Sequence, residues 1–344
     1  MANSGTSILI IYTGGTIGMI NDPETGSLAP FDFDHVMKQV PELNKFGFNL
    51  TTITFEEVVD SSNITPEIWI HLAELIERNY EKYNGFVILH GTDTMAYSAS
   101  ALSFLLENLG KPVVFTGAQL PIGTLRTDGK ENFISAIEIA AASKNNQPIV
   151  PEVTIFFENK LYRGNRTRKH NADYFDAFRS YNYPELAKAG INISYNYSAI
   201  HYPVIKHELK VYHELERNVA ILKLFPGITP EVVDAIIHIE GLKGLVLESY
   251  GSGNAPSLVW FIEKLKEAVN KGIVVLNVTQ CSAGSVEMGV YETSLGLIEA
   301  GVISGNDITT EAAICKLMFL LGQKLSKKEM EVFLTKSMRG EINV

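Results

Sequence analysis

The chain alternates between short apolar runs and longer amphipathic stretches. After Thr65 and Pro66, a pair typical of a helix start, apolar residues recur at helical spacing. Strand, turn, helix and strand in this order predict βαβ units and a parallel sheet. The apolar runs of strand length in the first half of the chain lie at 8–12, 86–89, 113–115 and 153–157.

The same pattern predicts where other helices begin and end. We expect a helix from Met95 to Leu109, because Gly110 is a residue on which helices commonly stop. A further helix is expected from Phe133 to Ala142.

The alternation also predicts the domain organisation. It weakens from about 192 to 217, where the chain is polar and aromatic, and resumes with "VAILKLFPG", "GLVLESYGSGN" and "GIVVLNVTQCSAG". Two helical patterns close the chain. We therefore predict two α/β domains, each a mainly parallel sheet flanked by helices: a larger N-terminal catalytic domain at 1–195, a linker at 196–218 and a smaller C-terminal domain at 219–344.

Composition and charge exclude several classes of protein. The 344 residues are 46% hydrophobic and 20% charged, enough for a large core in roughly two domains. The net charge of −10, without a basic stripe, argues against nucleic acid or an anionic membrane as partner. No apolar run reaches the length of a membrane span, and the short run near the N-terminus is expected to be a strand rather than a signal peptide.

Cysteine and histidine usage predicts neither a disulfide nor a metal site. Cys281 and Cys315 are far apart, which fits a reducing cytoplasm, and we expect both to be buried thiols. The eight histidines show no metal-binding spacing. No metal or cofactor is therefore expected.

Glycine and hydroxyl side chains follow the predicted strands in five loops. Ligands bind at the carboxyl ends of strands in open α/β sheets, so we expect these loops to converge on one edge and form a site. The loops read "TGGT", "HGTDT", "TGAQ", "ESYGSGN" and "TQCSAG".

The first of these loops, Thr13-Gly14-Gly15-Thr16, allows three interpretations. It is a tight turn whose threonine caps a helix, a phosphate loop of backbone N–H groups, or a turn that presents Thr16 as a nucleophile. Two glycines would let the backbone turn tightly and leave Thr16 uncovered.

A threonine nucleophile needs a base, and the sequence offers two candidates. His90 precedes "GTDT", where it more simply ends a buried strand. Lys169 lies in a cationic segment, "LYRGNRTRKHNADYF". It is either a lysine that burial keeps neutral, and so able to act as a base, or part of a solvated basic loop. Asp93 either caps the following helix or holds a substrate ammonium, and "DSSN", residues 60–63, offers hydroxyls to a carboxylate.

Four segments together resemble the type I bacterial L-asparaginases over essentially the whole chain: "YTGGTIG", "VILHGTDTMAYSASALSFLLENLGKPVVFTGAQ", "LYRGNRTRKHNADYFDAF" and "SYGSGNAP…VTQCSAG". The resemblance implies a flavodoxin-like N-terminal domain and a Rossmann-like C-terminal domain. It also implies cytoplasmic hydrolysis of L-asparagine to L-aspartate and ammonia through a threonine acyl-enzyme, without a cofactor, in a homodimer or homotetramer. Minor glutaminase activity is compatible with it.

The resemblance also assigns roles to single residues. Thr16 would be the nucleophile, and Thr92, Asp93 and Lys169 the second catalytic group. The α-carboxylate of the substrate would contact Ser61 and Ser62 next to Asp60, and Asp93 would hold its α-ammonium. Backbone N–H groups near Thr92 and Ala118 would form the oxyanion hole.

Two of the departures of this sequence from the family pattern concern the proton acceptor of Thr16 and regulation by asparagine. Ser27 stands where many members have a lid tyrosine, and we expect Tyr291 to take over as the group that relays the proton of Thr16; alternatively, Tyr291 only packs at an interface. Glu248 stands where some type I enzymes have an effector-binding arginine, so we expect no activation by asparagine.

Two other functions remain open at this level. One is the asparaginase-like subunit of a tRNA-dependent amidotransferase, although the acidic charge and the early first strand argue against it. The other is a non-enzymatic amino-acid-binding protein with two α/β lobes, which would need no Lys169 beside Thr92.

Overall fold

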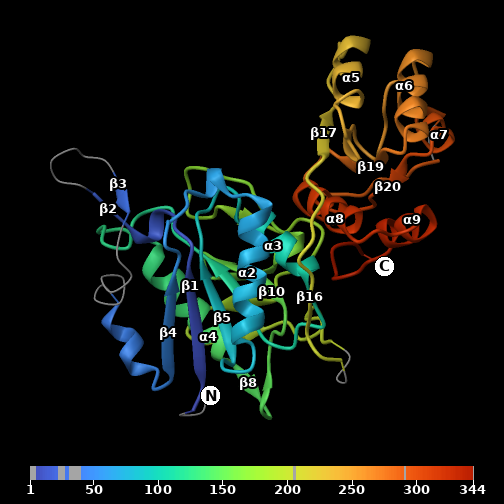
Figure 1. The fold of residues 1–344 in the computed structure, drawn as a ribbon. Coiled ribbons are helices and arrows are strands. Elements are labelled where there is room, and N and C mark those ends of the chain that lie inside the picture. The colour runs from blue at the N-terminus through green and yellow to red at the C-terminus, as the bar shows by residue number, and fades with distance from the viewer. Residues whose placement is uncertain (1–4, 22–27, 31–39, 204–206, 290–291, 344) are drawn as a thin grey trace. The chain divides into compact units, whose positions relative to one another are not determined.

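The chain divides into two compact units. A computed structural model describes residues 5–21, 28–30, 40–203, 207–289 and 292–343 (Figure 1). Unit 1 consists of Met1–Ser180 and Pro184–His213, and unit 2 of Tyr181–Tyr183 and Glu214–Val344.

Unit 1 is built on an eight-stranded sheet with the order β15-β14-β11-β10-β7-β5-β1-β4. From β4 to β10 neighbouring strands are parallel, and from β10 to β15 they are antiparallel. In chain order the parallel strands run 2-1-3-4-5, the flavodoxin-like order, whose switch point lies between β1 and β5. The strands are β1 (Ser7–Tyr12), β4 (Asn49–Thr54), β5 (Gly85–Leu89), β7 (Val113–Thr116), β10 (Val153–Phe157), β11 (Lys160–Arg163), β14 (Ala187–Ala189) and β15 (Ile193–Tyr195).

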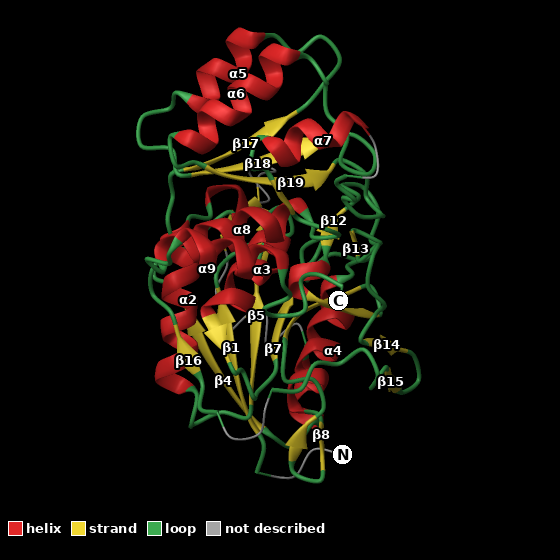
Figure 2. Cartoon of the chain, turned by 90° about the vertical axis from the view of Figure 1, so that its right-hand side faces the viewer, coloured by secondary structure: helices red, strands yellow, loops and turns green. Residues whose placement is uncertain are grey.

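The apolar runs of the sequence form the central strands of this sheet. Residues 8–11 of β1 and 86–89 of β5 are 0% exposed, as expected of parallel strands covered on both faces. Helix α4 packs against β1, β5, β7 and β10, and α2 packs against α3 (Figure 2). The helices are α2 (Pro66–Asn79), α3 (Met95–Leu105) and α4 (Gly129–Ala141), with short 3₁₀ turns η1 (Thr16–Gly18), η2 (Pro41–Lys45), η3 (Ser61–Asn63) and η4 (Gly164–Arg166).

Short two-stranded pairs complete unit 1. They combine β2 (Met19–Asn21) with β3 (Leu28–Pro30), β6 (Leu106–Glu107) with β16 (Lys210–Val211), β8 (Ser143–Lys144) with β9 (Gln147–Pro148), and β12 (Arg168–Lys169) with β13 (Phe178–Arg179).

Two helix limits differ from those predicted. The helix expected at 95–109 ends at Leu105, because Leu106 and Glu107 leave it to pair with β16 and Asn108 takes a left-handed conformation with φ 59°. The helix expected from Phe133 begins one turn earlier, at Gly129.

Unit 2 has a four-stranded sheet, β17-β18-β19-β20, in which all strands are parallel. Its core includes Leu245, Leu247 and Phe261, and α8 packs against the sheet. The elements are β17 (Val219–Lys223), α5 (Pro230–Ile237), β18 (Gly244–Ser249), α6 (Val259–Asn270), β19 (Val274–Thr279), α7 (Glu292–Glu299), β20 (Ile303–Ser304), α8 (Thr310–Gly322) and α9 (Lys327–Thr335).

The two cysteines differ in their exposure to solvent. Cys281 is exposed, so the expectation of two buried thiols is wrong for it, while Cys315 is buried as expected. Cys281 lies in the loop that follows the end of β19 at Thr279. Within the described residues, no helix has the length and apolar character that a membrane crossing requires.

Candidate active site

The loop after β1 turns on two glycines that no other residue could replace. Gly14 and Gly15 have φ angles of 133° and 93°. A Cβ on Gly14 would collide with the backbone of Val59, and one on Gly15 would lie 2.5 Å from the backbone nitrogen of Gly91. The backbones that precede Thr16 and Thr92 are thus in direct contact. Thr16 begins η1 and is half-buried, so it is not a helix cap.

Backbone hydrogen bonds join the loops that follow β1, β4 and β5. The N–H and hydroxyl of Thr13 both donate to the carbonyl of Leu89, at 3.0 Å each, and Val59 N–H donates to the carbonyl of Thr13 at 2.7 Å. The Thr94 hydroxyl donates to the carbonyl of Ser61 at 2.7 Å. These bonds fix Thr16 relative to Thr92 at the switch point of the sheet.

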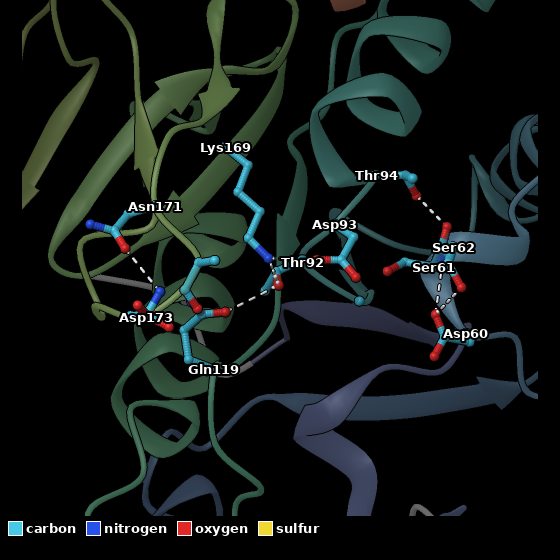
Figure 3. A network of polar contacts seen from close by, with 12 residues as sticks. Asp60, Ser61, Ser62, Thr92, Asp93, Thr94, Gln119, Lys169, Asn171 and Asp173 are labelled. Atoms are coloured by element: carbon cyan, nitrogen blue, oxygen red, sulfur yellow. Dashed lines mark hydrogen bonds and ion pairs between the residues drawn. The ribbon is translucent and has the colours of Figure 1, made fainter.

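Thr92, Asp93 and Lys169 form one hydrogen-bonded group (Figure 3). The Lys169 amine Nζ lies 2.8 Å from Thr92 Oγ1 and 2.6 Å from Asp93 Oδ1. Thr92 is buried, the Lys169 side chain is 18% exposed and that of Asp93 is 65% exposed. Lys169 is therefore not part of a solvated basic loop. Asp93 does not cap α3, whose N-cap residue is Thr94.

Lys169 is held by a small hairpin and by a buried ion pair. It lies on β12, which pairs with β13, and His170 N–H donates to the carbonyl of Ala177 at 2.8 Å. Upstream, the guanidinium of Arg163 contacts the carboxylate of Glu152 at 2.6 Å, and both side chains are less than a tenth exposed. A charge pair buried in this way fixes the start of the segment that carries Lys169.

His90 is a structural residue next to the site. The carbonyl of Gly91 can only accept, so His90 Nδ1, which faces it at 2.6 Å, donates to it and carries the ring proton. In the neutral ring, Nε2 then accepts from the Ser98 hydroxyl at 2.9 Å, and Ser98 Oγ accepts from the indole of Trp69 at 2.9 Å. Burial lowers the pKa of His90 to about 4, so the ring is neutral at pH 7. This arrangement supports the simpler of the two interpretations of His90.

The serines expected to hold a carboxylate lie on η3. The carboxylate of Asp60 accepts hydrogen bonds from the N–H and the hydroxyl of Ser62, both at 2.8 Å, and the Ser62 N–H, followed by its hydroxyl, lowers the pKa of Asp60. Ser61 is buried, and a Cβ on Gly91 would lie 2.5 Å from its hydroxyl oxygen. To bind a ligand carboxylate, the Ser62 hydroxyl would have to turn away from Asp60.

Gln119 is a member of this site that the sequence analysis missed. Its Oε1 accepts a hydrogen bond from the Thr92 hydroxyl at 3.1 Å. The backbone N–H of Gln119 donates to both carboxylate oxygens of Asp128, at 3.0 Å each. The loop "TGAQ" had pointed to this part of the site. However, the expectation was a backbone N–H near the buried Ala118, not the side chain of the next residue, Gln119.

The structure does not place every residue expected at the site. Tyr291 and Ser27 lie outside the described residues. Of the five loops expected on one edge, three follow β1, β5 and β7 in unit 1, whereas "ESYGSGN" and "TQCSAG" follow β18 and β19 in unit 2. The five loops thus belong to two sheets, because the strands before them pair in separate units.

One group of potential metal ligands occurs among the described residues, and it belongs to unit 2 rather than to the unit 1 sheet that carries Thr92. Asp234, His238 and Glu267 lie on and next to α5 and α6, where Lys264 contacts Asp234 at 2.7 Å and Lys271 contacts Glu267 at 2.7 Å. The site at the switch point instead offers hydroxyls, an amine and a carboxylate, a set suited to proton transfer and nucleophilic attack.

The fold and this site define a class: an α/β protein with a threonine–lysine–aspartate group at the switch point of a flavodoxin-like sheet. Family models make the class specific. The model "Asparaginase, N-terminal" matches residues 7–201, and "Glutaminase/Asparaginase C-terminal domain" matches residues 218–334. The chain belongs to the asparaginase family.

Individual relatives agree with this assignment. L-asparaginase 1 of Escherichia coli K12 is 45% identical over 340 residues, which cover 98% of each chain. The solved structure of L-asparaginase I from Vibrio cholerae O1 biovar eltor str. N16961 is 41% identical, with a TM-score of 0.87 over 99% of this chain and 100% of that one. A glutamyl-tRNA(Gln) amidotransferase subunit of Pyrococcus abyssi is 34% identical over 97% of this chain and 76% of that protein.

Proposed function

We propose that this protein hydrolyses L-asparagine to L-aspartate and ammonia through an acyl intermediate on Thr16. The observation that carries the proposal is the contact between Gly15 and Gly91, which brings Thr16 next to the group formed by Thr92, Asp93 and Lys169. Membership in the asparaginase family and the similarity to proteins named L-asparaginase support the substrate.

The reaction has two steps. Thr16 Oγ1 attacks the side-chain amide carbon of asparagine, and the hydroxyl proton of Thr16 passes to the amide nitrogen. Ammonia then leaves, and a β-aspartyl ester of Thr16 remains. Water then attacks the ester, returns a proton to Thr16 and releases aspartate. A hydroxyl is a weak nucleophile, so each step needs a group that accepts a proton. Lys169, in its uncharged form, is the proposed acceptor for the water or for Thr92.

The oxyanion of each step needs hydrogen-bond donors. His90 donates to the carbonyl of Gly91, and in a trans peptide the N–H of Thr92 then points away from the His90 ring. We assign this N–H, with one near Ala118, to the oxyanion hole; removal of such a donor typically costs about 3–4 kcal/mol in the transition state.

Charge and hydroxyl groups account for the two ends of the amino acid. The carboxylate of Asp93 is largely exposed and suits the α-ammonium of the substrate. Ser61 and Ser62, positioned by Asp60, suit its α-carboxylate. Selection against glutamine, which has one more methylene, is worth only about 1–3 kcal/mol in such a pocket, so minor glutaminase activity is part of the proposal.

The group that takes the proton of Thr16 belongs to the proposal as well. Ser27 is a poor acceptor because its hydroxyl is hardly acidic, and we assign this role to the phenol of Tyr291. The Tyr291→Phe variant should then lower kcat about 100-fold or more, whereas Ser27→Ala should change it little. The opposite pattern would return the role to the segment around Ser27.

The proposal extends to the assembly and the compartment of the protein. We infer a homodimer or homotetramer in the cytoplasm, without nucleic-acid partners. The two free cysteines suit a reducing compartment, and the net charge of −10 suits a protein that avoids nucleic acid. Sedimentation of the active protein as a monomer would refute the assembly.

Two rival functions are less well supported. The amidotransferase subunit is 34% identical, against 45% for the asparaginase. A simple binding protein would have no use for an amine held 2.8 Å from the Thr92 hydroxyl.

Ammonia and aspartate release from L-asparagine tests the function directly. The purified protein should release both in equal amounts without any added protein or RNA, and Thr92→Val should abolish this. Thr51→Ala, on the exposed face of β4, is a matched control that should retain wild-type activity. A binding protein would bind asparagine but release no ammonia, and an amidotransferase subunit would need its partners.

A further inference from the structure

Gln119 makes contacts with both of its side-chain ends. Its Oε1 lies 3.1 Å from Thr92 Oγ1, and its Nε2 lies 3.1 Å from the carbonyl of Ala172 and 3.3 Å from that of Tyr174. Ala172 and Tyr174 follow closely after Lys169 in the chain. Gln119 thus connects the Thr92 hydroxyl to the segment that carries Lys169.

These contacts fix the orientation of the amide. Carbonyl oxygens only accept hydrogen bonds, so the end of Gln119 that faces Ala172 and Tyr174 must be the NH₂ group. The end that faces Thr92 is therefore the oxygen, which can only accept. The single proton of the Thr92 hydroxyl is consequently directed at Gln119.

The direction of the next hydrogen bond follows. Because the proton of Thr92 is committed to Gln119, the amine of Lys169 must donate to Thr92 Oγ1 across the 2.8 Å contact. The Thr92 oxygen keeps one further lone pair, which can accept from a third group.

We propose that Gln119 is a positioning residue that sets the direction of proton donation in the site. By holding the Thr92 proton, it makes Lys169 the donor to Thr92 and leaves the remaining Oγ1 lone pair to accept a hydrogen bond from the attacking hydroxyl or water. Thr92 takes up that proton only as its own proton, released from Gln119, passes to the uncharged amine of Lys169. The catalytic part of this inference rests on the proposed amide hydrolysis, whereas the donor direction does not.

Other charged groups around Lys169 act independently of Gln119. Asp93 contacts the amine at 2.6 Å. On the hairpin of β12 and β13, His170 and Arg179 both face Asp176, at 4.0 Å and 2.8 Å. A substitution at Gln119 leaves these charges in place.

Substitution of Gln119 should not unfold its loop. The backbone N–H groups of Gln119 and Leu120 are held by the carboxylate of Asp128, and Asn132 donates to the same carboxylate. None of these bonds uses the Gln119 side chain.

Two variants separate positioning from simple packing. Gln119→Met removes the acceptor, so the Thr92 hydroxyl can donate to an uncharged Lys169, and a hydrogen bond to the uncharged form favours it. The pH at which Lys169 loses its proton should then fall below the wild-type value. Gln119→Glu keeps an acceptor oxygen for Thr92 and should leave this pH at or above the wild-type value.

The titration is measured by ¹³C NMR of the lysine ε-carbons, with the Lys169 signal assigned through Lys169→Arg. This readout needs no activity. In parallel, kcat of Gln119→Met on L-asparagine should fall about 10- to 100-fold with KM within about threefold.

The outcomes separate the two proposals. A wild-type protein that releases no ammonia refutes the function, while the titration still decides the role of Gln119. An active protein in which Lys169 titrates in Gln119→Met at or above the wild-type pH overturns the inference and leaves the function standing. A similar fall, in both variants, of the pH at which Lys169 loses its proton also overturns the inference. Disturbed packing around residue 119 would then explain the fall without any change in the direction of the hydrogen bond.

Discussion

At the scale of single residues, the site depends on where each hydroxyl and amine is held. Thr16 and Thr92 are both threonines after glycines, but their surroundings differ. Thr92 contacts both Lys169 and Gln119, whereas no described residue hydrogen-bonds to the Thr16 hydroxyl. A nucleophile must be free to reach the substrate, and a proton relay must be tied to its acceptor, so the two positions suit different roles.

Removal of the amine should stop catalysis without unfolding the protein. Lys169→Met should lower kcat on L-asparagine about 10²- to 10⁴-fold, the usual range for a lost acid–base group. Lys188→Met, at an exposed ion pair with Glu185, is the matched control and should behave as wild type. Steady-state kinetics with circular dichroism as a folding check would measure this. Near-normal turnover in Lys169→Met would remove the lysine from the mechanism.

His90 should make the protein less stable in mild acid. Its pKa is lowered by burial to about 4, below the unfolded value of 6.5, so the unfolded chain takes up a proton that the folded protein refuses. The stability that the neutral His90 contributes is fully present above pH 6.5 and is lost as the pH falls. At pH 5 the loss in the free energy of unfolding is about 2 kcal/mol.

Urea unfolding at pH 7.5 and pH 5 tests this assignment. His90→Gln should lose about 2 kcal/mol less than wild type between these values, whereas His207→Gln, at an exposed position, should follow wild type. Equal losses in wild type and His90→Gln would mean that His90 is not held neutral by the fold.

At the scale of elements, the sequence predicts strands better than helix ends. The apolar runs at 8–12, 86–89 and 153–157 all form strands, because burial on both faces requires an uninterrupted apolar run. The end of α3 was wrong by four residues, since nothing local reveals that Leu106 and Glu107 pair with a strand about a hundred residues later.

Local patterns also explain which site residues could be found. Glycine and hydroxyl loops mark Thr16, Thr92 and Asp93, because a sharp turn at a strand end has a visible sequence signature. Lys169 came from a cationic segment together with the family resemblance. The role of Gln119 depends on contacts with Ala172 and Tyr174, more than fifty residues away, which no local pattern encodes.

A buried ion pair should fix the C-terminal segment to α8. Lys316 contacts Glu341 at 2.6 Å, and both side chains are 0% exposed. Burial alone would raise the pKa of Glu341, but the Lys316 ammonium and two backbone N–H groups hold it below its usual value. Glu341→Gln leaves an uncompensated buried ammonium and should cost about 3–5 kcal/mol in the free energy of unfolding.

A control separates this cost from the removal of any charge. Glu185→Gln, at the exposed ion pair with Lys188, should cost less than about 1 kcal/mol. Urea denaturation of the two variants compares them. A loss below about 1 kcal/mol in Glu341→Gln would show that the pair does not anchor the segment.

At the scale of the whole molecule, the α/β class and the asparaginase family are confirmed. The repeated alternation of strand and helix predicts the class, and family models match both parts of the chain. The expectation that five loops share one edge was wrong, because periodicity does not reveal which strands join the same sheet. The three residues 181–183 are grouped with unit 2, which no pattern in the sequence indicates.

Regulation by asparagine should be absent. At the end of β18, the carboxylate of Glu248 accepts from the Thr310 hydroxyl at 2.6 Å and faces Lys223 at 3.6 Å. A buried carboxylate in this position would repel the carboxylate of an effector. The rate should therefore depend hyperbolically on asparagine concentration. A sigmoidal curve that Glu248→Gln abolishes would contradict this prediction.

The central claim is that Thr16 carries the acyl group, and peptide mass spectrometry tests it most directly. A slowly deacylating variant such as Lys169→Met, quenched in acid during turnover of L-asparagine, should carry one β-aspartyl group on the peptide that contains Thr16. The same experiment with Thr16→Ala in addition should give an unmodified protein. A β-aspartyl group on Thr92, or on any residue of the protein that lacks Thr16, would contradict the account.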